Sequence, residues 1–267
     1  MTRIEKTFEK LAAANEKALV GFVTAGDPDP ARSMDIIFSM IENGVDILEL
    51  GVPFSDPTAD GPVIQRSSAR ALKKGMNLEK VCGMVGAIRK KFADVPVIVF
   101  SYYNPIYAYG IEKFYRDFVS AGADGVLVVD LPAEESEEMT GQWTGDPLPL
   151  IRLVAPTTPD DRMKRIARVS EGFIYMVSKT GVTGSDGLDA AESSGQVERL
   201  KEMTRLPVCV GFGISTPSDV AQVARVADGV VIGSAFERTI EENLEDPTLA
   251  KRLGQQTADY KAATRMK

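Results

Sequence analysis

Two carboxylates on one stretch of the chain, Glu49 and Asp60, have the residue types and spacing best suited to chemistry. Glu49 lies near the end of an apolar segment, and if Ile47 points into the core, the two-residue period of a strand directs Glu49 the same way. Burying a carboxylate among apolar groups is costly unless it is paired or protonated, so its pKa is easily shifted. Asp60 closes the loop that follows. Two carboxylates in different environments can serve as an acid and a base.

Each of these residues also has a purely structural interpretation. Glu49 could form a salt bridge at a strand end, although its strand offers no obvious cationic partner. Asp60 could cap the helix that follows it, and Asp56 on the same loop could belong to a plain turn. We favour catalytic roles because the chain contains no histidine, which leaves acid–base work to carboxylates, lysine, tyrosine or cysteine.

The composition excludes several classes of function. Without histidine, Ser-His and Cys-His nucleophile pairs and histidine-bound metals are ruled out, and we expect no metal site. A net charge of −7 argues against a nucleic-acid partner. The N-terminus is charged and no apolar run is long enough to span a bilayer, so we expect a cytoplasmic protein without membrane association. Cys82 and Cys209 lie in apolar segments and are expected to be core residues in a reducing compartment.

Glycines cluster in three stretches of the second half of the chain, at residues 181–184, 211–213 and 233–234. Bare backbone N–H groups and a helix N-terminus can bind a phosphate without basic side chains. A single glycine is better explained by a turn, but three clusters after the last three expected strands favour a phosphate site. Aromatic and aliphatic residues near other strand ends could line a pocket for a flat ring: Phe22, Phe100, Tyr102, Leu127, Tyr175 and Phe212.

The elements that position these residues repeat one pattern, in which a short apolar strand is followed by a polar loop and an amphipathic helix. Several strands begin with a similar phrase that contains Asp, Gly and Val. Helix start signals occur at Asp29-Pro30, Asn77, Asp160 and Ser215-Thr-Pro217. The expected strands are Ala18–Thr24, Val45–Leu50, Val95–Ser101, Asp124–Asp130, Leu148–Ala155, Gly172–Ser178, Val208–Gly211 and Asp228–Gly233.

Eight such units predict an α/β fold with one (β/α)₈ barrel, a TIM barrel, as a single domain over residues 1–267. An additional N-terminal helix, Thr2–Ala14, has Ile4, Phe8 and Leu11 on one face and is expected to cover the bottom of the barrel. An open doubly wound sheet is the alternative, but no G-x-G-x-x-G follows the first strand. In a barrel, catalytic groups lie at the carboxyl ends of the strands, where Glu49 and Asp60 would then be found.

Motifs in order along the whole chain resemble those of the tryptophan synthase alpha family. The most specific is Glu-Leu-Gly-Val-Pro-Phe-Ser-Asp-Pro at residues 49–57 with Ala-Asp-Gly-Pro at 59–62. Shorter matches lie at residues 102–106, 130–132, 155–158, 181–184 and 211–214. The resemblance implies a lyase of tryptophan biosynthesis that cleaves indole-3-glycerol phosphate to indole and glyceraldehyde 3-phosphate. It further implies a beta subunit partner that holds pyridoxal phosphate, in a heterotetramer of two alpha and two beta chains, with no cofactor in this chain.

The resemblance also implies residue roles. Glu49 would be the acid–base group, Asp60 would accept the indole N–H, and Thr183 would organise Asp60 when its loop closes. Contacts to the substrate would come from Phe22, Tyr102, Leu127, Tyr175, Thr183 and Phe212, and contacts to its phosphate from Gly184, Gly213, Gly233 and Ser234. The beta subunit would face Pro53, Asp56, Thr58 and Pro132.

Two other functions remain open on the residues. Lys179 follows the sixth expected strand and could form a Schiff base as in some aldolase barrels, although a lysine at the start of a glycine-rich loop is better explained as solvated. A catalytically silent barrel that binds a phosphate ligand and regulates a partner is the second. Lys179 and Thr58 are also departures from the family pattern, with Thr58 standing where an aliphatic residue is usual.

Overall fold

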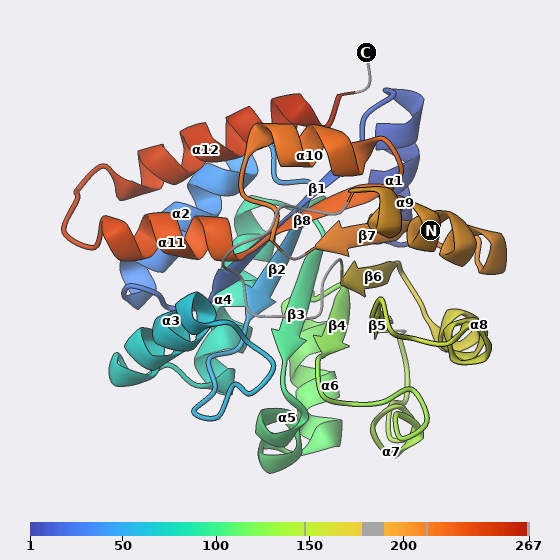
Figure 1. The fold of residues 1–267 in the computed structure, drawn as a ribbon. Helices are drawn as coiled ribbons and strands as arrows, with labels where there is room; N and C mark the ends of the chain where they lie inside the picture. Colours follow the sequence, from blue (N-terminus) through green and yellow to red (C-terminus); the bar gives the residue numbers. More distant parts are fainter. Residues whose placement is uncertain (147, 178–189, 212, 266–267) are drawn as a thin grey trace.

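Eight parallel strands close into a barrel with helices around it (Figure 1). The computed structural model describes residues 1–146, 148–177, 190–211 and 213–265, and of residues 190–194 only the backbone. The strands pair in sequence order and β8 pairs in parallel with β1, so the expected (β/α)₈ barrel is confirmed and the open sheet is excluded. They are β1 (Ala18–Thr24), β2 (Ile47–Gly51), β3 (Val97–Ser101), β4 (Gly125–Val128), β5 (Leu150–Val154), β6 (Ile174–Val177), β7 (Val208–Gly211) and β8 (Gly229–Ile232).

Three helices begin at capping residues that the sequence marks as helix starts. Asp29 accepts the N–H groups of Ala31 and Arg32, Asn77 accepts that of Lys80, and Thr216 forms a capping box. The helices are α1 (Arg3–Ala13), α2 (Pro30–Glu42), α3 (Pro62–Lys73), α4 (Leu78–Lys91), α5 (Tyr103–Tyr109), α6 (Ile111–Ala121), α7 (Glu137–Thr140), α8 (Asp160–Val169), α9 (Ala190–Met203), α10 (Pro217–Ala224), α11 (Ser234–Glu242) and α12 (Leu249–Ala263). None of these helices is long and apolar enough to cross a bilayer.

Most strands are shorter than expected, and the aspartates of the recurring Asp/Gly/Val phrase explain part of the difference. Asp46, Asp124 and Asp228 precede their strands, and each carboxylate accepts a backbone N–H at the start of a neighbouring strand. The N–H groups are those of Leu19, Val97 and Val208, at distances of 2.8 to 3.0 Å. These aspartates therefore lie outside the strands, and each links the start of its own strand to the start of a neighbouring one.

Side chains at alternate strand positions point inward and fill the barrel. Those at the positions between them point outward and belong to a second core outside the barrel. Ile47 lies in the inner cluster, which includes residues from strands all around the barrel. Ile4 and Leu11 of α1 pack into the same cluster, with Phe8 partly buried against it. The prediction that the N-terminal helix covers the bottom is thus confirmed.

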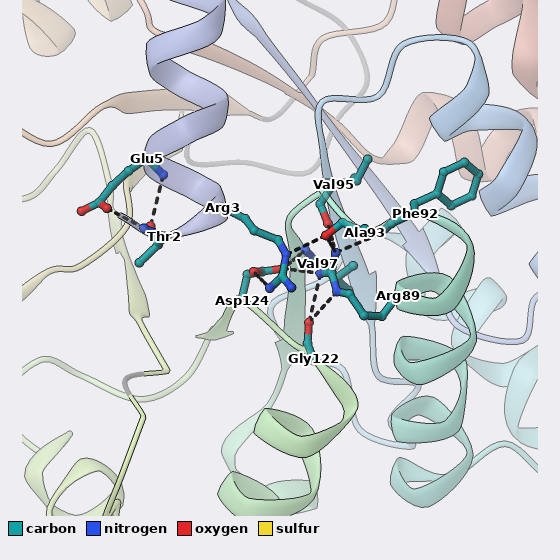
Figure 2. Close-up of polar contacts among 10 residues, drawn as sticks. All are labelled: Thr2, Arg3, Glu5, Arg89, Phe92, Ala93, Val95, Val97, Gly122 and Asp124. Carbon is teal, nitrogen blue, oxygen red and sulfur yellow. Dashed lines mark hydrogen bonds and ion pairs between the residues drawn. The ribbon is translucent and has the colours of Figure 1, made fainter.

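An ion cluster ties α1 to the base of the barrel (Figure 2). The carboxylate of Asp124, only 5 % exposed, binds Arg3 of α1 and Arg89 of α4. Arg89 also donates to backbone carbonyls, among them that of Gly122. Since Asp124 accepts the N–H of Val97 as well, one buried carboxylate joins two helices and two strands.

Candidate active site

A pocket opens at the carboxyl ends of the strands, opposite α1. Its walls come from strands β1, β2, β3, β6 and β8, from the starts of α3 and α11, and from the segment after β7. The lining residues are Phe22, Glu49, Asp60, Gly61, Pro62, Val63, Ile64, Phe100, Tyr175, Gly213, Ile214, Val231, Gly233 and Ser234.

Glu49 lies in the middle of β2, with Phe22 of β1 and Ile98 of β3 at the same level of the sheet. Its side chain points inward, as the period of two predicts from Ile47, and the residue is 1 % exposed. Its Oε1 atom has no hydrogen-bond partner among the described residues, so the salt bridge considered for a strand end is absent there. Burial without a charged partner raises the pKa of Glu49 to about 8. The group is therefore mostly protonated at neutral pH and within reach of titration.

The carboxylate of Asp60 is fixed by a tyrosine hydroxyl and does not cap a helix. The Tyr102 hydroxyl donates to Asp60 Oδ2 at 3.0 Å and accepts the N–H of Ala59 at 2.9 Å. Burial raises the pKa of Asp60 to about 6, while the Tyr102 hydrogen bond opposes the rise. Gly61, not Asp60, is the N-cap of α3, so the capping interpretation is wrong. At neutral pH the two carboxyl groups of the pocket differ in charge, with Asp60 ionised and Glu49 protonated.

Aromatic rings form the apolar wall of the pocket. Phe22 and Phe100 meet edge to face, with ring centroids 5.2 Å apart, and Tyr175 is 6 % exposed. The Tyr175 hydroxyl occupies the space beside Gly211, where a Cβ atom would overlap it. Glycine at this position of β7 is therefore what admits the tyrosine ring.

Backbone groups that follow β7 and β8 also line the pocket. Gly233 is the N-cap of α11 and has no side chain to pair with the first N–H groups of that helix, which begins at Ser234. Gly213, with φ of 75°, adopts a left-handed conformation that side chains disfavour. These features suit an anionic group at the positive end of α11.

The pocket brings together eight residues named from the sequence: Phe22, Glu49, Asp60, Phe100, Tyr175, Gly213, Gly233 and Ser234. Tyr102 does not line it but supports Asp60 from behind, and Leu127 lies in the inner core of the barrel. Thr183, Gly184, Phe212 and Lys179 fall outside the described residues.

Sequence reasoning missed the apolar residues from the first turn of α3 and from β8. Ile64 and Val231 line the pocket, and so does Ile214. The alternation along β8 points Val231 inward and was a usable signal, whereas nothing local shows that α3 starts at the pocket rim.

The four residues expected to face a partner differ in exposure. Asp56, Thr58 and Pro132 are exposed, but Pro53 is buried. Asp56 accepts a hydrogen bond from the Ser55 hydroxyl and Thr58 donates its N–H to the Asp56 carbonyl, so the exposed loop is internally braced. Pro53 could contribute to a docking surface only through the backbone that it fixes.

The family model described as tryptophan synthase alpha chain matches residues 8–265. The chain belongs to this family. A tryptophan synthase alpha chain from Desulfosudis oleivorans is 61% identical over 266 residues and covers 100% of both chains. Another from Desulfatibacillum aliphaticivorans is 61% identical and covers 99% of this chain and 100% of its own. The crystal structure of tryptophan synthase subunit alpha from Legionella pneumophila is 40% identical, with a TM-score of 0.91 over 99% of this chain and 98% of that one. Family membership assigns this chain a lyase role in tryptophan synthesis.

Proposed function

We propose that this chain cleaves indole-3-glycerol phosphate to indole and glyceraldehyde 3-phosphate. The observation that carries the proposal is a buried Glu49, whose Oε1 has no partner among the described residues, in one pocket with Asp60. The apolar wall formed by Phe22, Phe100 and Tyr175 fits a flat indole ring, and the uncapped start of α11 fits the phosphate.

Glu49 begins the reaction as a neutral acid. It donates its proton to the indole carbon that bears the side chain, which leaves Glu49 as a carboxylate and places a positive charge on the ring. The carboxylate then removes the proton of the neighbouring hydroxyl, the bond between that carbon and the ring breaks, and the aldehyde forms. Glu49 ends protonated again, so a single group with a pKa of about 8 serves as acid and base in turn.

Asp60 acts on the indole nitrogen. As a carboxylate it accepts the indole N–H and stabilises the positive charge that develops when the ring is protonated. Tyr102 fixes its orientation through the 3.0 Å hydrogen bond to Oδ2. Gly213, Gly233 and Ser234 bind the phosphate, together with Gly184, while Thr183 and Phe212 complete the substrate contacts.

The experiment that tests this function is an assay of indole release from indole-3-glycerol phosphate, followed by borohydride treatment of the reacting mixture. Acid–base cleavage releases indole and leaves no covalent adduct. An adduct at Lys179, identified by mass spectrometry, would replace this mechanism with the Schiff-base one. Tight binding of glycerol phosphate without any indole release, alone or with a beta subunit, would support the silent regulatory barrel.

The two pKa values predict the pH profile of cleavage. Asp60 must be ionised, so kcat/KM should fall as the pH drops below about 6, and Glu49 must start protonated, so it should fall again above about 8. The measurement is kcat/KM between pH 5 and 9.5 in buffers of constant ionic strength. Because the substrate phosphate also titrates near 6, Asp60→Asn is the control: its residual activity should lack the contribution of Asp60 to the acidic limb. A profile flat up to pH 9.5 would contradict the role of Glu49.

A beta subunit that holds pyridoxal phosphate is the proposed partner, in an assembly of two alpha and two beta chains that works in the cytoplasm. We place its docking surface at the carboxyl-end face, on the exposed residues Asp56, Thr58 and Pro132. The loop that carries Asp56 and Thr58 continues directly into Asp60, so docking there changes the position of a catalytic carboxylate.

Coupling between partner and substrate must be reciprocal. We expect the beta subunit to raise the indole-releasing rate, and glycerol phosphate to tighten the complex by the same coupling free energy, of about 1–3 kcal/mol. Titration of the beta subunit with and without glycerol phosphate measures it. An unchanged dissociation constant together with an unchanged rate would show that the alpha chain acts alone.

A further inference from the structure

A buried carboxyl group lies one turn inside α11, the helix whose first residues line the pocket. Glu237 is 0% exposed, and its Oε1 accepts the N–H of Thr24, at the end of β1, at 2.6 Å. Its Oε2 is buried and receives no hydrogen bond from the described residues. A second carboxyl group, that of Asp27, lies within hydrogen-bonding distance.

The charges around this pair balance only if one of the two acids is neutral. Asp27, 1 % exposed, accepts two hydrogen bonds from Arg70 of α3, at 2.7 and 2.8 Å. Arg70 also binds Glu241, which in turn forms a two-pronged pair with Arg66. Two arginines thus face Asp27 and Glu241, and no further positive charge in the described part of the chain pairs with Glu237. Protonation of Oε2 removes the excess negative charge, and the protonated Oε2 then donates a hydrogen bond to the Asp27 carboxylate.

This cluster connects the two helices whose first turns both line the pocket. α3 begins at Pro62, two residues after Asp60, and carries Arg66 and Arg70. α11 begins at Ser234 and carries Glu237 and Glu241, and the two helices pack against each other. Thr24 Oγ1 and Ser67 Oγ, 2.7 Å apart, add a second link between β1 and α3.

We propose that Glu237, as a neutral acid that donates to Asp27, is a positioning residue that sets the start of α11 relative to α3, and thereby the phosphate-binding end of the pocket relative to Asp60. The inference rests on the proposed function for the identity of the pocket. Burial, together with the charge of Asp27, raises the pKa of Glu237 well above its ordinary value, in agreement with the neutral form.

Three variants separate this role from simple packing. Glu237→Gln keeps shape and a neutral N–H donor for Asp27, Glu237→Leu keeps bulk but loses the donor, and Glu242→Gln makes the same chemical change at an exposed position of the same helix. Calorimetric titration with glycerol 3-phosphate should show parental binding for both glutamine variants and roughly tenfold weaker binding for Glu237→Leu, because leucine removes both the acceptor of the buried Thr24 N–H and the donor to Asp27. KM should follow binding, with a smaller change in kcat.

Infrared spectra test the proton itself. The C=O stretch of protonated carboxyl groups should lose the contribution of Glu237 in both Glu237 variants and keep it in Glu242→Gln, while the contribution of Glu49 remains in all three. Parental binding by a folded Glu237→Leu, equal weakening in Glu237→Gln, or an unchanged carboxyl band would each overturn the proposal. If Glu237→Leu does not fold, Glu237→Ala takes its place in the comparison. Neither glycerol 3-phosphate binding nor the infrared band needs indole release, so a chain that fails to cleave the substrate but passes these two tests refutes the proposed function alone.

Discussion

Glu49→Gln is expected to lower indole release by at least roughly 10²–10⁴-fold, the range typical of a lost general acid–base group. Glutamine has nearly the same shape but cannot lend and recover a proton. In the described part of the pocket, the other carboxylate is Asp60, whose place beside Tyr102 suits the ring nitrogen instead. The measurement is the initial rate of indole formation. Near-parental release by the folded variant would remove Glu49 from the mechanism.

The same substitution should stabilise the protein at alkaline pH. Folding raises the pKa of Glu49 from 4.5 to about 8, so the folded state holds a proton that the unfolded state loses. The stability associated with that proton is fully present below pH 4.5 and declines as the pH rises to about 8. Glutamine does not titrate, so its advantage over the parent should grow across this window, to roughly 5 kcal/mol at the upper end.

Denaturant unfolding of parent and variant at several pH values measures this difference. Glu135→Gln, at an exposed position, is the control and should follow the parent. A difference that stays constant with pH would mean that Glu49 is not protonated by burial.

The second large effect is expected at the other end of the barrel. Asp124→Ala should lower the free energy of unfolding by about 3–5 kcal/mol, because it leaves the guanidinium of Arg89 buried without its carboxylate. The N–H of Val97 also loses its acceptor. Arg3→Gln is the matched comparison: its side chain is 39% exposed, so the loss should stay below about 1 kcal/mol. Chemical denaturation measures both free energies of unfolding. Similar small losses in the two variants would contradict the buried ion cluster at Asp124.

The barrel was predictable because its signals are local and repeated. Apolar strands of similar length, capping residues such as Asp29 and Asn77, and the period of two that carries Ile47 and Glu49 inward are all read within a few residues. Strand ends were less predictable, because the aspartates before β2, β4 and β8 accept hydrogen bonds from backbone N–H groups of other strands.

The site was predictable only in part, for the same physical reason. Glu49 and the glycines stand out by type and position, but the hydrogen bond between Tyr102 and Asp60 joins residues 42 positions apart. The contact of Glu237 with Thr24 spans 213 positions, and a glutamate within an amphipathic helix pattern carries no mark of burial. Hydrogen-bond partners far away in the sequence therefore determine which polar residues are buried and take part in the site.

The closed ring of strands determines when the barrel can form during synthesis on the ribosome. Ala18 of β1 pairs with Gly229 of β8, so the first strand of the nascent chain keeps an open edge until the last strand has been synthesised. α12 packs on α2 and Lys261 bonds Asp46, so the outer layer also waits for the C-terminus. Contacts of such separation slow folding and leave an unpaired strand edge exposed for most of synthesis. Truncated chains that lack β8 should therefore be captured by chaperones or aggregate, although they already carry Glu49 and Asp60.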